Sequence, residues 1–323
     1  MTITQLQYVL AVAEYQNFTK AAQKVFVTQP TLSMQIQKLE DELGVRIFDR
    51  SKKPIQLTET GRKIVNQARN IVNESDRIQD IVDQQKGFIG GTFRIGIIPT
   101  IMPTLLPMFL NNFIKKYPKV KLKIEELNTD TIIERLKEGH LDAAIAATPL
   151  ETENIKEQIL YYEPFVAYIP QSHRLSKLEK LKVEDLDIDD ILLLEDGHCF
   201  KDGILNLCKT PKNLNGDHFQ LESGSFETLV KLANEGLGMT LLPYLHTLDL
   251  NENESKNLKM FQDPVPAREV SLIYNKSELK IHIIEALKST ISGVVKGAIA
   301  FQNVKIISPL SKSKKKLQFK KSN

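Results

Sequence analysis

The feature that most constrains this chain is a pair of helical patterns joined by a tight turn, residues 18–43, which read FTKAAQKVFVTQPTLSMQIQKLEDEL. Thr19 can cap the first helix and Val27 ends it. Thr28 can cap the second helix, and Pro30 falls in its first turn, where a missing N–H costs little. One buried face of this second helix is predicted from four apolar residues at spacings of four, three and four: Leu32, Ile36, Leu39 and Leu43.

The opposite face of the second helix is mostly polar. Short polar side chains and glutamine at the start of such a helix suit base edges in the major groove of DNA. A plain helical hairpin with a solvated polar face has the same spacing, so this pattern alone leaves both interpretations open. The residues expected to contact DNA are Thr28, Gln29, Pro30, Thr31, Ser33, Met34, Gln35 and Lys38.

A basic segment follows at residues 45–61, VRIFDRSKKPIQLTETG. Arg50, Lys52 and Lys53 precede a proline and a short β-like run, as in a hairpin wing that contacts phosphates. This segment favours a winged helix-turn-helix over a plain helical hairpin.

A long helix is predicted next, capped by Thr58 and carrying an acidic residue in its first turn. At roughly 28 residues it would span ~42 Å, too long to bury its apolar seam alone. The seam repeats every seven residues, which is typical of helix pairs, so a second copy of the chain is the expected partner. The expected dimerisation residues are Ile64, Ala68, Ile71, Ile78 and Val82, with Ser75 in the same row.

The run from residue 18 to residue 50 resembles the N-terminal signature of the LysR-type transcriptional regulators, through its AA, QP, LS, QI, LE, LG and F-R elements. The resemblance implies a DNA-binding domain at 1–58, a linker helix at 59–87 and a regulatory domain at 88–300. It also implies that the regulatory domain is α/β, with two Rossmann-like subdomains, as in periplasmic binding proteins. Double-stranded DNA, RNA polymerase and further copies of the chain, in a dimer of dimers, are the implied partners.

A glycine-rich break, KGFIGG at residues 86–91, separates the two halves, because glycine is unfavourable inside a helix and easily accommodated in turns. Beyond it, short apolar runs alternate with helical patterns, which predicts a parallel α/β sheet. Strands are expected at 92–98, 120–127, 143–148, 165–170, 190–196, 238–243 and 268–274, and helices at 105–117, 131–139, 226–236 and 280–292.

Ligands of such sheets bind where strands end and helices begin. Three turns of this kind are Pro99–Thr100, Asn128–Thr129 and residues 197–199. Threonine at a strand-to-helix turn is also a good helix cap. For Thr100 and Thr129 the residues by themselves therefore favour capping over ligand binding.

The chain has two cysteines, Cys199 and Cys208, nine positions apart in EDGHCFKDGILNLC. This spacing fits no common zinc pattern, whereas idle buried thiols and a redox pair both remain compatible with it. Phe200, Ile204 and Leu207 would share one helix face, which puts Cys199 near a helix N-terminus and Cys208 on the apolar side. Such a helix separates the cysteines by about 13.5 Å along its axis, whereas a disulfide needs Cα atoms within about 7 Å. If the segment is helical, it must unfold before the cysteines can pair.

This stretch also resembles the peroxide-sensing members of the same family, and the likeness extends through IPTIMPTLLP, ELNTDTI, SFETL, GMTLLP and REVSLIY to about residue 290. It implies that Cys199 reacts with hydrogen peroxide to a sulfenic acid, that Cys208 resolves it as a reversible disulfide, and that a cellular thiol reductant resets the pair. The peroxide-binding residues implied are Thr100, Thr129, His198 and Arg268. By itself, Arg268 reads as an ordinary surface or ion-paired arginine.

Charge and hydropathy limit the partners and the cellular location that can be expected. The net charge of +3 comes from residues 311–323, which hold six lysines and no acid, so the rest carries −3 and gives no global argument for nucleic acid. We expect residues 301–323 to be a disordered basic tail, at most adding weak DNA affinity. No apolar run approaches the ~20 residues of a membrane span, and the N-terminus lacks the pattern of a secretory signal, so a cytoplasmic location is expected.

These patterns and the family resemblance together predict a cytoplasmic transcription factor with no metal or cofactor. The resemblance implies that it responds to peroxide and regulates oxidative-stress genes. Because its cysteine reacts once per signal, it is not expected to be an enzyme. Two alternatives stay open. One is a LysR-type regulator with incidental cysteines, which senses a small metabolite in a cleft between the two expected subdomains. The other is a thiol peroxidase tethered to DNA.

Overall fold

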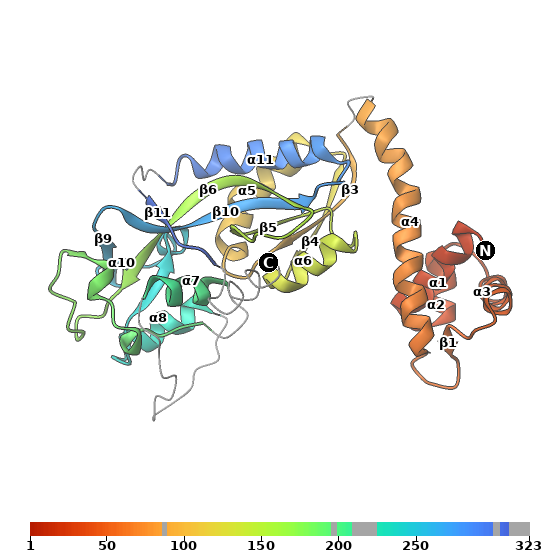
Figure 1. Ribbon diagram of the computed structural model, residues 1–323, viewed down its shortest axis with the longest axis horizontal. Coiled ribbons are helices and arrows are strands. Elements are labelled where there is room, and N and C mark those ends of the chain that lie inside the picture. Colours follow the sequence, from red (N-terminus) through yellow and green to blue (C-terminus); the bar gives the residue numbers. More distant parts are fainter. Residues whose placement is uncertain (86–88, 195–198, 209–224, 300–303, 310–323) are drawn as a thin grey trace, which may run out of the picture. The chain divides into compact units, whose positions relative to one another are not determined.

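The computed structural model describes residues 1–85, 89–194, 199–208, 225–299 and 304–309. The chain divides into two compact units, Met1–Phe88 and Ile89–Asn323 (Figure 1). The elements described in the N-terminal unit are α1 (Ile3–Tyr15), α2 (Phe18–Lys24), α3 (Gln29–Leu43), β1 (Phe48–Asp49), β2 (Gln56–Leu57) and α4 (Glu59–Gln85).

Side-chain caps fix the starts of the two helices in the predicted helix-turn-helix. The Thr28 hydroxyl accepts a hydrogen bond from the backbone N–H of Thr31 at 3.4 Å, which confirms the predicted start of α3. The predicted cap of α2, Thr19, is wrong. Asn17 accepts from the backbone N–H of Lys20 at 3.0 Å instead, so Thr19 lies inside the helix. Asparagine in an extended backbone conformation is as good a cap as threonine, and the pattern did not separate the two.

The buried face of α3 is confirmed for Leu32, Ile36 and Leu39, which are completely buried. Leu43 was wrongly included, because it is 40% exposed. Gly44 adopts a left-handed backbone conformation, with φ of 67°, and ends the helix there. The last turn of α3 therefore extends beyond the core of the unit.

The C-terminal unit holds one large sheet with helices packed against it. Its described elements are β3 (Gly91–Ile97), α5 (Met102–Lys116), β4 (Val120–Glu126), α6 (Thr129–Lys137), β5 (Ala143–Thr148), β6 (Ile155–Tyr168), β7 (Lys180–Leu181), α7 (Cys199–Leu207), α8 (Phe226–Asn234), β8 (Thr240–Pro243), α9 (Tyr244–Thr247), α10 (Glu252–Ser255), β9 (Leu258–Phe261), β10 (Val265–Asn275), α11 (Ile281–Val295) and β11 (Val304–Ile306), with short 3-10 turns at Val183–Asp185 and Ile188–Asp190.

The sheet is mixed rather than parallel. Its main path runs β4-β3-β5-β10-β6-β9-β7, with β8 also paired to β6 and β11 to β10. Strands β3, β4 and β5 are parallel, as predicted, but β10 is antiparallel to both β5 and β6. The prediction extended the strand–helix alternation of residues 92–148 to the whole sheet. No helix was predicted between strands 238–243 and 268–274, and a strand that is not reached through a crossover helix can pair antiparallel, as β10 does.

Two strand predictions also need correction. Strand β6 begins at Ile155, ten residues before the predicted start, because its first half mixes apolar with charged residues and gives no continuous apolar run. The strand expected at 190–196 is reduced to a single bridge between Ile191 and Met239, while residues 195–196 lie outside the described residues.

Strands β6 and β10 run side by side through the whole C-terminal unit (Figure 1). Each contributes to two separate hydrophobic cores. Tyr161 and Val270 belong to a first core, with β3, β5, α5 and α11, while Phe165 and Val265 belong to a second core, with α7 and α8. We call the parts around these cores the first lobe and the second lobe. The predicted two-subdomain α/β architecture is thus confirmed, and the lobes share two strands.

The tail expected from residue 301 is not disordered throughout. Residues 304–306 form β11, which pairs in parallel with β10 at residues 265–267. The next residue, Ile307, is buried at 8% exposure in the second core. The apolar residues that precede the lysines therefore pack against the second lobe. Among the described residues, no helix is both long and apolar enough to span a membrane.

Candidate functional site

Two oppositely charged side chains face each other where β6 and β10 pass from one lobe to the other. Arg268 and Glu163 are cross-strand neighbours with exposures of 3% and 1%. The Nε and Nη2 groups of Arg268 donate to Oε2 of Glu163 at 2.9 and 2.7 Å. The other carboxylate oxygen accepts the backbone N–H of Leu245 at 3.0 Å. A buried pair is tolerated when its hydrogen bonds are satisfied in this way, and the two charges form a fixed, neutral element.

Thr100 lies against this arginine. Nη1 of Arg268 donates to the Thr100 hydroxyl at 2.9 Å, and Nη2 donates to the Thr100 carbonyl at 2.9 Å. Helix α5 has Ile101 at its N-cap and no side-chain cap, so the capping interpretation of Thr100 is wrong. Because the hydroxyl oxygen accepts from Arg268, the hydroxyl proton is left to donate to a further group.

Thr129 does not cap its helix either, so the capping interpretation drawn from the residues alone is wrong here too. Asn128 caps α6 by accepting from the backbone N–H of Thr131 at 2.9 Å. The Thr129 hydroxyl is buried and has no hydrogen-bond partner among the described residues. A buried hydroxyl without a partner is costly, which points to a water or a ligand at this position.

Two neighbouring side chains are neutral near pH 7. Burial raises the pKa of Tyr161 well above its usual range, Glu163 adds to the rise and Arg268 opposes it. Burial lowers the pKa of His246, whose ring lies 4.9 Å from that of Phe226. The fixed charges at this position therefore come from Arg268 and Glu163.

Helix α7 begins at Cys199 and continues through Leu207, as the sequence predicted. Cys208 follows at the end of the helix, where its N–H donates to the carbonyl of Ile204 at 2.9 Å and its side chain is 4% exposed. The two cysteines thus occupy opposite ends of one helix. His198 lies outside the described residues, and only the backbone of Cys199 is described.

Phe200 links this helix to the charged pair. Its ring lies under the guanidinium of Arg268, with 5.3 Å between the Cζ atom and the ring centroid, and makes edge contacts with Phe165 and Phe226. Contact between a cation and an aromatic face is favourable, more so when buried. Arg268 therefore contacts both Thr100 in the first lobe and α7 in the second.

Glu163 and Phe200 were not predicted as residues of this site. A glutamate within an apolar run, in the sequence YYEPFVAY, is a weak signal of a buried carboxylate, because such residues are rarely buried unless paired. No local signal identifies its partner, since Arg268 lies 105 residues further along the chain.

The predicted DNA-binding residues of α3 lie along the outside of the N-terminal unit. Lys38 and Met34 are exposed, Met34 at 60%. Ser33 and Gln35 are partly buried, and Gln35 accepts a hydrogen bond from Gln5 of α1 at 3.3 Å. Thr28 is part of the cap. The other residues in this band are Gln29, Pro30 and Thr31, which are exposed.

The wing is confirmed as an antiparallel hairpin of β1 and β2. Lys52 and Lys53 are exposed between its strands. Arg50 is also exposed and makes two contacts with its own unit: Nη2 donates to Oε2 of Glu40 at 3.1 Å, and the guanidinium lies 5.0 Å from the ring centroid of Phe18. Arg50 thus holds the wing to α3, a role that the sequence did not predict.

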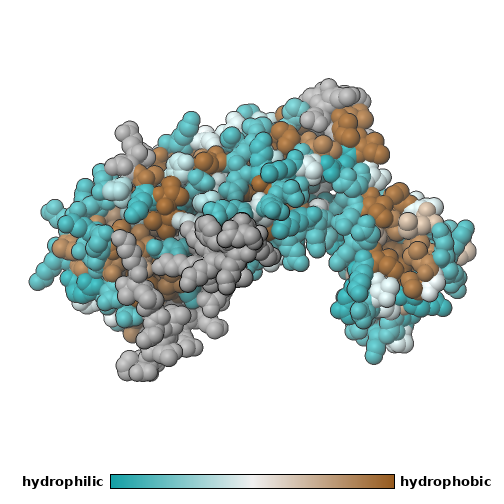
Figure 2. Space-filling model, viewed as in Figure 1, coloured by the Kyte–Doolittle hydropathy of each residue, from teal (hydrophilic) through white to brown (hydrophobic). Residues whose placement is uncertain are grey.

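Three of the five predicted dimerisation residues on α4 pack against the core of their own unit. Ala68 is 1% exposed, and Ile64 and Ile71 pack against the core formed with α1. Ile78 and Val82 are 67% and 37% exposed, as a partner helix would require. The seam was predicted from spacing alone, which does not tell an internal neighbour from a second copy. Figure 2 shows hydrophobic surface on this unit.

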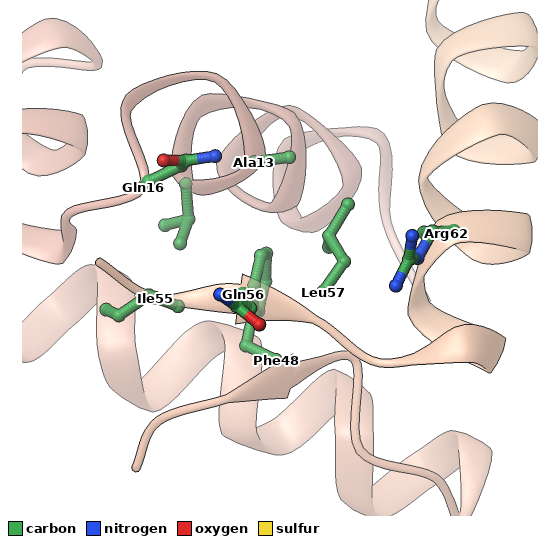
Figure 3. A pocket seen from close by; sticks show the side chains of 8 residues that line it. Ala13, Gln16, Phe48, Ile55, Gln56, Leu57 and Arg62 are labelled. Carbon is green, nitrogen blue, oxygen red and sulfur yellow. The ribbon is translucent and has the colours of Figure 1, made fainter. Parts of the chain in front are cut away.

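A cavity of about 380 Å³ lies between α1, the wing and the start of α4 (Figure 3). None of the predicted site residues line it. The residues around it are Val12, Ala13, Gln16, Phe48, Ile55, Gln56, Leu57 and Arg62.

Comparisons with known proteins agree for both units. Residues 3–62 match the family described as bacterial regulatory helix-turn-helix protein, lysR family, and residues 86–293 match the LysR substrate binding domain. The chain is 33% identical over 301 residues to a hydrogen peroxide-inducible genes activator of Haemophilus influenzae, covering 93% of this chain and 99% of the relative. It is also 33% identical to the DNA-binding transcriptional dual regulator OxyR of Escherichia coli K12, over 85% of this chain and 89% of that protein.

Among solved structures, a full-length OxyR variant from Pseudomonas aeruginosa matches with a TM-score of 0.72 and 33% identity, over 90% of this chain and 98% of the other. A hydrogen-peroxide-bound OxyR mutant from Corynebacterium glutamicum matches with a TM-score of 0.63 and 27% identity, over 94% and 98% of the two chains.

Proposed function

We propose that this chain, which belongs to the LysR family of bacterial transcriptional regulators, senses hydrogen peroxide with Cys199 and converts the signal into a change in DNA binding. The observation that best supports this is the contact of Arg268 with both Thr100 and Phe200, beside the helix that begins at Cys199. Relatives named for peroxide-inducible genes and a neighbour bound to hydrogen peroxide add support.

In the first step, the thiolate of Cys199 attacks one oxygen of hydrogen peroxide. The S–O bond forms as the O–O bond breaks, and the leaving hydroxide takes up a proton to become water. A helix N-terminus favours the thiolate. Arg268 and the hydroxyls of Thr100 and Thr129 are suited to bind peroxide and to stabilise the charge on the leaving oxygen, because buried donors act strongly where water is excluded. The sequence resemblance assigns His198, the residue before Cys199, to peroxide binding as well.

In the second step, the sulfur of Cys208 attacks the sulfenic acid, an S–S bond forms and water leaves. Cys208 is buried at the far end of α7, so the helix must first unfold. Gly203 in the middle of α7 lowers helix stability by roughly 1 kcal/mol relative to alanine. A thiol reductant returns the pair to two thiols.

Unfolding of α7 removes side chains from the second core and releases Phe200 from Arg268. The rearrangement reaches DNA through the assembly of two or four copies, with α4 joining copies through Ile78 and Val82. The exposed face of α3 contacts bases, and Lys52 and Lys53 contact phosphates. The changed spacing of the DNA-binding units alters contact with RNA polymerase in the cytoplasm.

The direct test is intact-mass analysis of the reduced chain after one equivalent of hydrogen peroxide. We expect the mass to fall by two hydrogen atoms within seconds, as an internal disulfide requires. A mass that stays unchanged, or changes only as slowly as an ordinary thiol oxidises, would contradict the sensor. The region around Thr100 and Thr129 would then be tested for binding of a small metabolite.

Thr129→Val removes the hydroxyl that lacks a partner and keeps the shape of the side chain. We expect the rate of Cys199 oxidation to fall about tenfold, as the loss of one hydrogen bond predicts. The melting temperature should not fall, because no internal hydrogen bond is lost. Thr131→Val, at a partly buried position of the same helix, is the control, and an unchanged rate in Thr129→Val would return Thr129 to a structural role.

Lys52→Ala and Lys53→Ala are expected to weaken DNA binding at every sequence and to leave peroxide oxidation unchanged. Each lost phosphate contact should lower the slope of log affinity against log salt by about 1. Lys63→Ala, on the exposed side of α4, where Lys63 pairs with Glu59, is the matched control. The measurement is fluorescence anisotropy with a promoter fragment at several salt concentrations; equal slopes in all variants would remove the wing from the interface.

A further inference from the structure

A short segment near the C-terminus joins the helix of the cysteines to the strand of Arg268. We call residues 304–309 the strap. Its first three residues form β11, which pairs with Val265, Pro266 and Ala267 of β10, and the backbone N–H of Ile307 donates to the carbonyl of Ala267 at 2.8 Å. The strap thus ends its pairing one residue before Arg268. The family match stops at residue 293, so the strap lies beyond it.

The strap also contacts α7. The side-chain amide of Asn206, in the last turn of α7, donates to the backbone carbonyl of Ser308 at 2.9 Å. Ile307 lies in the same hydrophobic core as Ile204, Leu207 and Cys208. Asn206 lies in the last turn of α7, and Ile204, Leu207 and Cys208 place the apolar side of the same segment in the core that holds Ile307. Unfolding of α7 would therefore break both of its links to the strap.

We propose that the strap is a brake on the sensor, which holds α7 in its helical form and so slows closure of the disulfide. The inference rests on the proposed function, because only closure requires α7 to unfold. The first step, attack of Cys199 on peroxide, takes place with α7 helical and is not affected. The second step, in which the S–S bond forms and water leaves, carries the added cost of breaking the contacts with Asn206 and Ile307.

The strap also shifts the equilibrium between the dithiol and the disulfide. Contacts made only with the helical form stabilise the dithiol relative to the disulfide, as any interaction with one of two states does. A chain without the strap should therefore be harder to reduce. The strap adjusts how long the oxidised signal lasts, without touching the reacting atoms.

The test compares a chain that ends at Asn303 with one that ends at Pro309. The longer chain keeps the strap but lacks residues 310–323, so it controls for loss of the lysines. Each reduced chain is mixed with one equivalent of hydrogen peroxide, quenched with dimedone at set times and weighed intact. The decay of the dimedone-reactive sulfenic acid gives the rate of closure, and loss of hydrogen peroxide gives the rate of the first step, because closure consumes no peroxide.

We expect closure to be about tenfold faster in the chain that ends at Asn303, from one hydrogen bond and part of a buried isoleucine, with first steps within about twofold of each other. Equal closure rates, or a change confined to the first step, would overturn the brake. If neither chain forms a disulfide, the proposed function fails instead.

Two further measurements keep the proposal testable if the shorter chain does not fold. Ile307→Ala should speed closure, whereas Ile306→Ala, at a neighbouring residue that is 37% exposed, should not. Hydrogen exchange of the α7 amides in the reduced chain should be faster in Ile307→Ala than in Ile306→Ala. Equal exchange in the two variants would show that the strap does not stabilise α7, whatever the cysteines do.

Discussion

Cys199→Ser should slow the reaction of the chain with hydrogen peroxide by roughly a thousandfold or more, because a serine hydroxyl is a far weaker nucleophile than a thiolate at neutral pH. The remaining thiol, Cys208, is buried at 4% exposure and lies at the C-terminal end of α7, where the helix dipole does not favour a thiolate. The measurement is the second-order rate of peroxide loss with the reduced protein in excess.

Cys208→Ser is the matched variant. It should react with peroxide at the rate of the unaltered chain and then accumulate a sulfenic acid at Cys199 that dimedone labels. Equal loss of reactivity in the two variants would contradict the division of roles. A Cys199→Ser chain that still reacts quickly would place the reactive group elsewhere.

Arg268→Ala should lower the free energy of unfolding of the C-terminal unit by about 3–5 kcal/mol, the usual cost of leaving one member of a buried ion pair without its partner. Glu163 is 1% exposed and accepts the three hydrogen bonds described above. The variant removes the two from Arg268 and leaves the one from the Leu245 N–H. The measurement is urea unfolding followed by far-ultraviolet circular dichroism, read on the transition of the C-terminal unit.

Two controls separate lost charge balance from lost packing. The double variant Glu163→Gln with Arg268→Gln removes both charges and should recover most of the stability, while still oxidising slowly because the cation is gone. Arg135→Ala breaks the exposed pair with Glu125 and should cost no more than about 1 kcal/mol. A double variant as unstable as Arg268→Ala would mean that packing, not charge, governs this position.

The N-terminal unit was the more predictable half because its determinants are local. Helices α3 and α4 begin where Thr28 and Thr58 cap them, and Thr58 accepts from the Gly61 N–H at 2.8 Å. What the sequence did not indicate there depends on neighbours across the fold: Arg50, predicted to contact phosphates, also pairs with the buried carboxylate of Glu40.

In the C-terminal unit the sequence indicated single strands better than their partners. Apolar runs such as 143–148 were found, but the antiparallel insertion of β10 between β5 and β6 depends on pairings more than 100 residues apart. For the same reason Thr100 and Thr129 could not be assigned from residues alone. A capping threonine and a ligand-binding threonine look alike until Asn128 and Arg268 are placed beside them.

The sharing of β6 and β10 by both lobes limits how this sensor can move. A strand extends by about 3.3 Å per residue and cannot stretch, and its hydrogen-bonded ladder resists opening. Any movement of one lobe against the other must therefore bend or twist these two strands. A change in the twist of the two strands at Arg268 and Glu163 would rotate one lobe against the other. A small rearrangement at α7 would thus reach the first lobe as a twist of β6 and β10. Two paired strands transmit such a rotation over a longer distance than a loop does.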